Sequence, residues 1–155
     1  MSIDVGSQAP DFTLMNQDRQ PVTLSAVLRN GPVVLAFLPG AFSSVCTTEM
    51  CTFRDSIGAL EASQAQVLGV TTDTFFALKA WADQQRFTFP LLSDYNKDVI
   101  QQYDVVNPDM IGLKNIAKRA VFVIGRDGTI KHKQVLADAR NEPDYEKVLG
   151  AVDAL

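Results

Sequence analysis

Residues 39–51 have the sequence PGAFSSVCTTEMC, which joins an apolar segment to an amphipathic one. The segment before it, VVLAFL at residues 33–38, is typical of a strand buried on both faces. After it, apolar side chains recur every three or four residues, at Cys46, Met50, Phe53, Ile57 and Leu60. This spacing predicts a helix with one apolar face that runs to about Gln64. Cys46 is therefore expected where a loop at the end of a strand enters the first turn of a helix.

The start of a helix is a chemically distinctive place for a cysteine. The backbone N–H groups there have no intrahelical partner, and the helix dipole puts partial positive charge beside them. Both effects favour the thiolate, which is the nucleophilic form of cysteine. The alternative is that Cys46 is a small buried hydrophobic residue, as many free cysteines are. The position alone leaves both interpretations open.

Length and composition are those of one globular domain. The chain has 155 residues, enough for a single domain (residues 1–155) with a sizeable core. Its net charge of −4 and its lack of a basic cluster argue against nucleic-acid binding. No window is long and apolar enough for a membrane, and residues 1–6 lack the features of a signal peptide. We therefore expect a cytoplasmic protein whose two cysteines are catalytic or redox-active rather than a structural disulfide.

The rest of the chain alternates short strands with helices. Strands are predicted in a hairpin over residues 12–24, at 67–71, at 89–92, and in a second hairpin over 120–136. Helices are predicted from Asp73 or Thr74, from Asp94 or Asn96, and at the end of the chain with Pro143 in the first turn. Residues 105–118 show no clear period and are predicted to form a long loop. This order predicts an α/β fold in which a mixed central sheet carries helices on both faces, with an N-terminal hairpin.

Several segments agree in order with one known family. Pro39, Ser43 and Cys46 fit the pattern Pro-x-x-x-Thr/Ser-x-x-Cys, and APDF at 9–12, FTFPLLSD at 87–94 and Arg119 before AVFVI at 120–124 extend the match. On these residues the chain resembles the peroxiredoxins, which are thiol peroxidases with a thioredoxin-like fold. FTFPLLSD and the pair Ala41-Phe42 are most similar to the bacterial alkyl hydroperoxidase E type. Cys51 is instead similar to the second cysteine of the Q type, the bacterioferritin-comigratory proteins.

The resemblance implies a mechanism centred on Cys46. Its thiolate attacks the terminal oxygen of hydrogen peroxide or an organic hydroperoxide and becomes a sulfenic acid. The Ser43 hydroxyl, the backbone N–H groups of Val45 and Cys46, and the Arg119 guanidinium are the candidate donors to the peroxide oxygens. Pro39, which has no N–H, is expected to fix the loop and shield the thiolate. Without the resemblance, Ser43 reads as an ordinary loop residue and Arg119 as one more solvated cation.

Two further residues have roles only by analogy with the family. Glu49 resembles the acid with which some members orient the arginine, although an acid in a first helical turn is also favoured by the helix dipole alone. Phe42 is expected to line the substrate mouth or a dimer contact. The resemblance therefore also implies a homodimer.

Cys51 follows Cys46 by five residues and has two interpretations. In the Q-type pattern it attacks the sulfenic acid and forms an intramolecular disulfide, which a thioredoxin- or glutaredoxin-like reductant then reduces. Otherwise it is an inert second thiol, and the protein is a one-cysteine peroxidase that an external thiol resolves.

The sequence supports no cofactor. Two cysteines and the single histidine, His132, do not supply a four-ligand zinc site, and no glycine-rich nucleotide motif is present. Peroxiredoxins use no metal, haem or flavin. Two other functions remain open: a thioredoxin-like disulfide oxidoreductase, which normally has Cys-x-x-Cys, and a non-enzymatic binding or chaperone module on the same fold.

Overall fold

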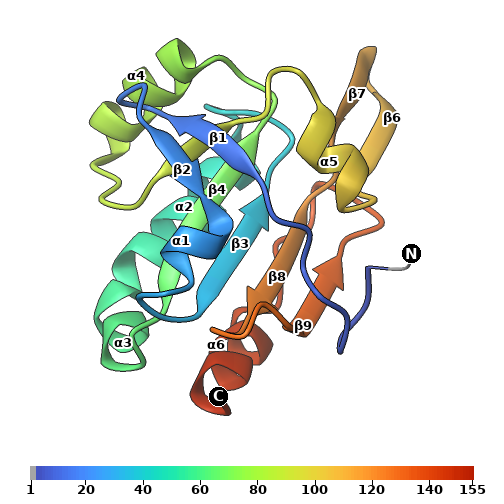
Figure 1. Cartoon of the computed structure of the whole chain (residues 1–155). Helices are drawn as coiled ribbons and strands as arrows, with labels where there is room; N and C mark the ends of the chain where they lie inside the picture. The colour runs from blue at the N-terminus through green and yellow to red at the C-terminus, as the bar shows by residue number, and fades with distance from the viewer. Residues whose placement is uncertain (1–2) are drawn as a thin grey trace.

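The computed structural model describes residues 3–155 and is built around one mixed sheet (Figure 1). The sheet has seven strands in the order β2-β1-β5-β4-β3-β8-β9. These strands are β1 (Thr13–Asn16), β2 (Pro21–Thr23), β3 (Val33–Phe37), β4 (Gln66–Thr71), β5 (Leu91–Ser93), β8 (Ala120–Ile124) and β9 (Ile130–Val135). The helices are α1 (Leu24–Val27), α2 (Ser44–Asp55), α3 (Ile57–Ala62), α4 (Phe75–Gln85), α5 (Asp98–Gln102) and α6 (Tyr145–Asp153). A separate hairpin is formed by β6 (Val106–Met110) and β7 (Leu113–Ala117).

Strand β3 is the buried centre of the sheet. It pairs in parallel with β4 and antiparallel with β8, and every one of its residues is buried. Because successive side chains point to opposite faces, Leu35 and Phe37 join one core cluster while Val34 and Ala36 join the other. This placement explains why the segment is apolar without alternation.

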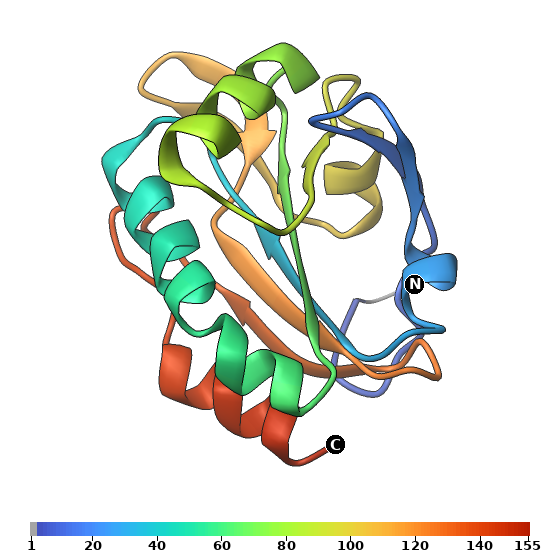
Figure 2. The ribbon, with the colours of Figure 1, turned by 90° about the vertical axis from the view of Figure 1, so that its left-hand side faces the viewer.

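Helices cover both faces of the sheet, as Figure 2 shows. Helices α1 and α5 pack on one face, where Leu24 and Ile100 join the first core cluster. Helices α2, α4 and α6 pack on the other, where Met50, Trp81 and Val148 join the second. The predicted α/β fold, with a mixed sheet, helices on both faces and an N-terminal hairpin, is confirmed.

The prediction of a long loop over residues 105–118 is wrong, because the segment forms the β6–β7 hairpin. This ribbon lies outside the central sheet and leaves most of its side chains exposed or half-buried, so no buried face imposes an alternating pattern. Pro108 lies within an unshifted register that pairs Asn107 with Ile116 and Asp109 with Lys114, and a proline inside a segment argues against a strand at the level of sequence. The turn at Ile111 and Gly112 has positive φ at both residues, a geometry usually signalled by Asn-Gly rather than Ile-Gly.

Several predicted boundaries also shift. The helix expected to run to Gln64 is divided at Ser56, whose hydroxyl donates to the Thr52 carbonyl and competes with the helical pattern. Thr74 caps α4 as predicted, accepting from the Ala77 N–H. Pro143, predicted in the first turn of the last helix, lies before α6, which begins at Tyr145 with Asp144 as its N-cap. Helix α5 begins later than expected, although the Asp94 carboxylate accepts from its Val99 and Ile100 N–H groups.

Candidate active site

Cys46 lies in the first turn of α2, where the sequence predicts it, and is fully buried. The first backbone hydrogen bond of the helix runs from the Thr47 N–H to the Ser43 carbonyl. The N–H groups of Val45 and Cys46 precede this bond and have no acceptor within the helix. They are available to an anion or to a polar substrate at this end of the helix.

Arg119 reaches this helix because of the strand pairing. It immediately precedes β8, and the register pairs Ala120 with Phe37 at the end of β3. The segment that carries Arg119 therefore lies at the sheet edge where the chain leaves β3 toward Cys46. Its Nη1 atom lies 3.2 Å from Cys46 Sγ and 3.2 Å from Glu49 Oε1, and its Nε donates to the Ala139 carbonyl at 2.9 Å.

Glu49 and Arg119 form a buried ion pair beside the thiol. The two side chains are 0% and 3% exposed, so solvent screens their charges little. Burial raises the pKa of Glu49 from 4.5 to about 8, and the nearby Arg119 opposes that rise. Among the residues that the structure describes, none donates a hydrogen bond to Glu49 Oε2. The same Arg119 nitrogen thus contacts both the Glu49 carboxyl and the Cys46 sulfur.

A pocket of about 650 Å³ opens over the start of α2. Four predicted site residues line it: Pro39, Ser43, Val45 and Arg119. Its other walls come from the tip of the β6–β7 hairpin and from residues 137–140. Sequence reasoning missed both segments, because a presumed loop and a stretch without a periodic pattern gave no signal for them. Arg119 lines this pocket, and its guanidinium also contacts the buried sulfur of Cys46.

Ser43 and Phe42 lie differently from the simplest expectation. The Ser43 hydroxyl donates to the Gly40 carbonyl at 3.0 Å and so is committed to the loop. Phe42 is 50% exposed and is not among the residues that line the pocket, which argues against a place in the substrate mouth. Its ring lies 6.3 Å from that of Trp81, and its φ of 66° falls in the left-handed region that non-glycine residues rarely adopt.

Comparisons with known proteins agree with this geometry. Residues 5–133 match the model of the AhpC/TSA family. The chain belongs to this family of peroxiredoxins. It is 35% identical to alkyl hydroperoxide reductase E of Mycobacterium tuberculosis, over 98% of this chain and 99% of that protein. The crystal structure of peroxidoxin BcpB from the same organism superposes with a TM-score of 0.89 at 32% identity, covering 99% and 98% of the two chains. A PrxQ variant from Xylella fastidiosa gives a TM-score of 0.87 at 26% identity, covering 99% and 98%.

The chain is thus a peroxiredoxin, a thiol peroxidase that reduces hydroperoxides. The predicted family, the thioredoxin-like fold and the enzyme class are confirmed. The comparisons include both E-type and Q-type relatives, which are the two types that the sequence resembles. They therefore do not assign the chain to one of these two subfamilies.

Cys51 lies farther along α2 of this peroxiredoxin and is half-buried. Both thiols are free. The Cys51 Sγ lies 3.6 Å from Gln85 Oε1, and Arg54 donates to the Gln85 carbonyl, so this part of α2 is held against the end of α4. In a regular helix, Cα atoms five residues apart are about 8.6 Å apart. A disulfide requires about 4.4 to 6.8 Å, so the folded helix keeps the two sulfurs from bonding.

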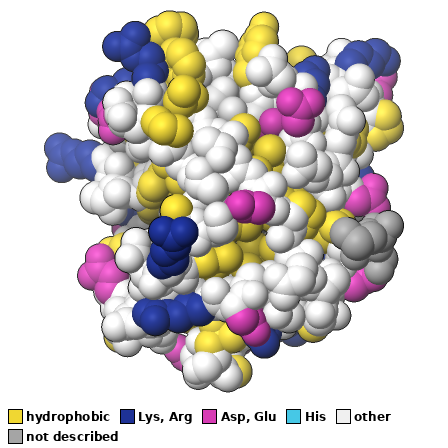
Figure 3. Space-filling model, viewed as in Figure 1, with side chains coloured by type: hydrophobic (Ala, Val, Ile, Leu, Met, Phe, Trp, Pro, Cys, Tyr) yellow, Lys and Arg dark blue, Asp and Glu magenta, His cyan; other side chains and the backbone are white. Residues whose placement is uncertain are grey.

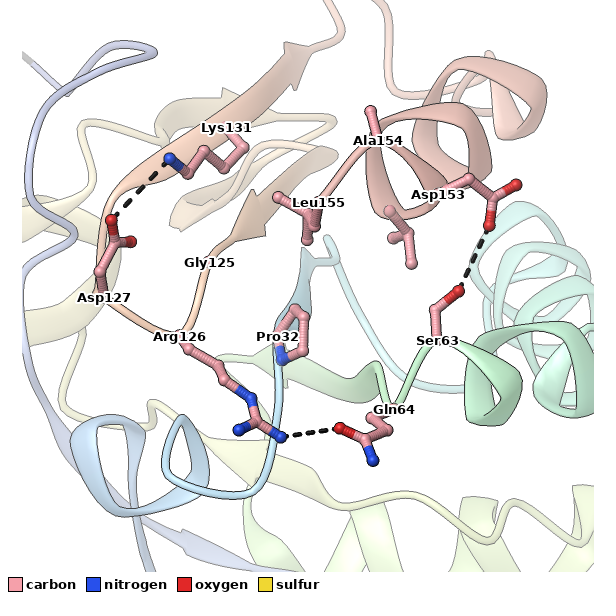
Figure 4. A pocket seen from close by; sticks show the side chains of 11 residues that line it. Pro32, Ser63, Gln64, Gly125, Arg126, Asp127, Lys131, Asp153, Ala154 and Leu155 are labelled. Carbon is pink, nitrogen blue, oxygen red and sulfur yellow. Dashed lines mark hydrogen bonds and ion pairs between the residues drawn. The ribbon is translucent and has the colours of Figure 1, made fainter.

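A second pocket, of about 660 Å³, lies between the β8–β9 turn and the ends of α3 and α6 (Figure 4). None of the predicted site residues lines it. Its polar side chains are paired with one another: Arg126 with Gln64, Ser63 with Asp153, and Lys131 with Asp127 (Figure 4). These pairings leave no cluster of free polar groups among the described residues that line the pocket.

Within residues 3–155, no group of three or more His, Cys, Asp or Glu side chains is arranged to hold a metal ion. None of the helices in the same range has the length and apolar character needed to cross a membrane.

Proposed function

We propose that Cys46 is the peroxidatic cysteine and that it reduces hydrogen peroxide and organic hydroperoxides through a sulfenic acid. A sulfur electron pair forms an S–O bond, the O–O bond breaks, and the leaving oxygen takes up a proton and departs as water or an alcohol. The observation that carries this proposal is the Arg119 guanidinium, 3.2 Å from Cys46 Sγ and at the wall of the pocket. A positive charge at this position supports the proposal, because it lies beside both the proposed nucleophile and the pocket through which we propose that the peroxide enters.

The other site residues support this step. The N–H groups of Val45 and Cys46 are proposed to donate to the peroxide oxygens as negative charge develops on them. Ser43 is proposed to keep the loop in place through the bond from its hydroxyl to the Gly40 carbonyl, and it is one of the residues that line the pocket. Pro39 is buried and lines the pocket, consistent with a shielding role.

We further propose that Cys51 resolves the sulfenic acid. The Cys51 thiol attacks the oxidised sulfur, the S–O bond breaks with release of water, and an intramolecular disulfide forms. Because the folded helix separates the two residues, the first turn of α2 must unwind before this bond forms. A thioredoxin- or glutaredoxin-like dithiol then reduces the disulfide and is itself oxidised. The reducing cytoplasm supplies such a reductant, and we propose it as the compartment of the enzyme.

The test of this cycle is a stopped-flow titration with peroxide followed by mass analysis. One equivalent of hydrogen peroxide should be consumed rapidly by the reduced protein, which should lose about two mass units as the disulfide forms. The same oxidation should slightly lower the helical circular dichroism, since the start of α2 unwinds. A protein that leaves the peroxide unconsumed would contradict the proposal at its first step.

Cys51→Ser separates the two-cysteine mechanism from its alternative. In this variant Cys46 should stop at the sulfenic acid, with a gain of about 16 mass units, and further peroxide should overoxidise it. An external thiol should rescue it, and the helical signal should stay unchanged. If the wild type also accumulates stable sulfenic acid, Cys51 is a bystander and the protein is a one-cysteine peroxidase. The contact that holds Cys51 against Gln85 favours the one-cysteine alternative. Comparing the wild type with Cys51→Ser therefore supports one mechanism or the other, whichever result is obtained.

We propose that the protein is a homodimer. Phe42, Phe76 and Tyr95 are 50%, 67% and 61% exposed, which is unusual for aromatic side chains. Phe76 and Tyr95 line one shallow pocket, and Phe42 packs toward Trp81 on the helix that also carries Phe76. On the face seen in Figure 3, hydrophobic side chains show near the upper edge and also across the middle, and Lys and Arg are scattered among Asp and Glu.

Light scattering at tens of micromolar protein tests the dimer. The expected mass is twice that of the 17.0 kDa chain, and Phe42→Ser should shift the equilibrium toward monomer because it removes an exposed apolar side chain. Measurement of a 17.0 kDa particle alone at that concentration would refute the dimer.

A further inference from the structure

The loop between β3 and α2 is tied to the start of α4 by a side chain that the mechanism above does not use. The Ala41 N–H donates to Asp73 Oδ2 at 2.7 Å. Strands β3 and β4 are adjacent and parallel, so the loops that follow them lie at the same edge of the sheet. Asp73 follows β4 and therefore stands beside the loop that leads to Cys46.

Asp73 is itself held in place by its main chain. Its N–H donates to Thr71 Oγ1 at 3.0 Å, and its carbonyl accepts from Ser93 Oγ at 2.6 Å. Thr71 is fully buried at the end of β4. None of the salt bridges within residues 3–155 involves Asp73, so its carboxylate is directed to the loop rather than to a cation. The backbone of Asp73 is thus fixed by two hydrogen bonds, while its carboxylate accepts from one N–H of the loop before α2. This is the arrangement expected of a side chain that positions a loop.

The loop needs such a contact because its backbone is strained. Phe42 has a φ of 66°, and this conformation persists in a bulky residue only when its surroundings fix it. The hydrogen bond to Ala41 fixes the residue before Phe42, and the bond from Ser43 Oγ to the Gly40 carbonyl closes the turn around it. Helix α2 begins at Ser44, directly after this turn, and Cys46 lies in the first turn of the helix.

We propose that Asp73 is a positioning residue of the peroxidase, which latches this loop in the conformation that presents Cys46 and the first N–H groups of α2 to the hydroperoxide. This inference rests on the proposed function of Cys46. We call the hydrogen bond from the Ala41 N–H to the Asp73 carboxylate the latch. Breaking it frees the loop and the first turn of α2, which is the segment that must unwind before the disulfide forms. The contact of Cys51 with Gln85 lies at the far end of α4 and does not depend on the latch. Asp73 therefore favours oxidation of Cys46 and opposes its resolution by Cys51.

Two variants separate the accepted hydrogen bond from the charge. Asp73→Ala removes the acceptor, whereas Asp73→Asn keeps an oxygen at the same place without the charge. Asp83→Ala is the matched control, because Asp83 is an exposed aspartate on α4, the helix that follows Asp73, and its ion pair within residues 3–155 is with Lys79 at the surface. Trp81 is the only tryptophan, donates to Thr47 Oγ1 at 3.2 Å and packs beside Phe42, so its fluorescence reports on the state of the loop.

The first measurement uses reduced protein without peroxide. In Asp73→Ala, hydrogen exchange of the peptide over residues 39–47 should rise about ten- to a hundredfold, the range expected when a partly buried donor loses its acceptor. Exchange in Asp73→Asn and Asp83→Ala should stay near that of the wild type. Unchanged exchange in Asp73→Ala would overturn the latch. Asp73→Ser, whose hydroxyl is one bond shorter than the carboxylate, serves if the alanine variant does not fold.

The second measurement follows the two chemical steps by Trp81 fluorescence in stopped flow. Asp73→Ala should oxidise Cys46 at least about tenfold more slowly and form the disulfide faster, and Asp73→Asn should restore both rates. Opposite changes in the two steps are not expected from a uniform loss of stability. Equal rates in the wild type and Asp73→Ala, or an asparagine variant as impaired as the alanine one, would overturn the proposal. A wild type that does not react with peroxide would instead refute the proposed function, while the exchange result still decides whether the latch exists.

Discussion

Cys46→Ser is expected to remove peroxide turnover completely while leaving the fold intact. Serine is nearly isosteric with cysteine, but its hydroxyl does not ionise near neutral pH and supplies no comparable nucleophile. Arg119, 3.2 Å from the sulfur, remains available to donate to the new hydroxyl, so the substitution leaves no stranded polar group. Peroxide consumption in stopped flow measures the loss, and circular dichroism checks the fold.

Cys51→Ser is the control for this experiment, because it removes the other thiol of the chain. It should keep the first oxidation step that Cys46→Ser loses. Residual turnover close to that of the wild type in Cys46→Ser would contradict the proposed mechanism, since no other residue has been assigned as nucleophile.

Local pattern was sufficient to predict the environment of Cys46. The apolar run before residue 39 and the helical spacing after it predict a buried strand and the first turn of a helix, and both are present as β3 and α2. Such patterns extend over a few neighbouring residues, so they carry information on local structure. The division at Ser56 escaped them, because a hydroxyl that bonds to the preceding turn changes no apolar spacing.

Long-range contacts were predictable only through the family. Arg119 and Cys46 are 73 residues apart and meet because β8 pairs with β3, a pairing that no local pattern specifies. The resemblance to peroxiredoxins singled out Arg119, and the structure places it beside the sulfur. Asp73 was predicted only as a possible helix cap, and Ala139 was assigned no role. Asp73 accepts from a main-chain N–H and Ala139 offers its carbonyl, and every residue type except proline carries the same main-chain groups.

Arg119→Ala should slow the oxidation of Cys46 by about 10²- to 10³-fold, the loss typical of removing one donor that stabilises a transition state. Ionisation of the thiol explains only part of such an effect. A cysteine with a pKa of about 8.5 is already roughly 7% thiolate at about pH 7.4, so complete ionisation gains little more than tenfold. The remainder must come from charge that develops as the O–O bond breaks, and this is the contribution that raises the intrinsic rate.

Arg119→Ala also affects Glu49, so a second variant is needed to interpret its oxidation rate. Removing Arg119 leaves Glu49 fully buried without its cation, and burial has already raised the pKa of this carboxyl to about 8. Without the opposing charge, the pKa of Glu49 should rise further, and keeping the carboxylate ionised would destabilise the fold. Arg119→Ala combined with Glu49→Gln removes that stranded acid. Its oxidation rate therefore reports on the missing guanidinium rather than on a damaged core.

The decisive measurement is the dependence of the oxidation rate on pH. Each variant should reach a plateau once Cys46 is fully ionised, and the plateaus are compared. We expect the plateau of the double variant to stay at least about a hundredfold below that of the wild type. Arg119→Lys should lie in between, because one ammonium keeps the charge but does not reproduce a planar fork that contacts Cys46, Glu49 and the Ala139 carbonyl together. Equal plateaus would mean that Arg119 acts on the ionisation of Cys46 alone, and the stabilisation of the breaking O–O bond would then have to come from the N–H groups of Val45 and Cys46.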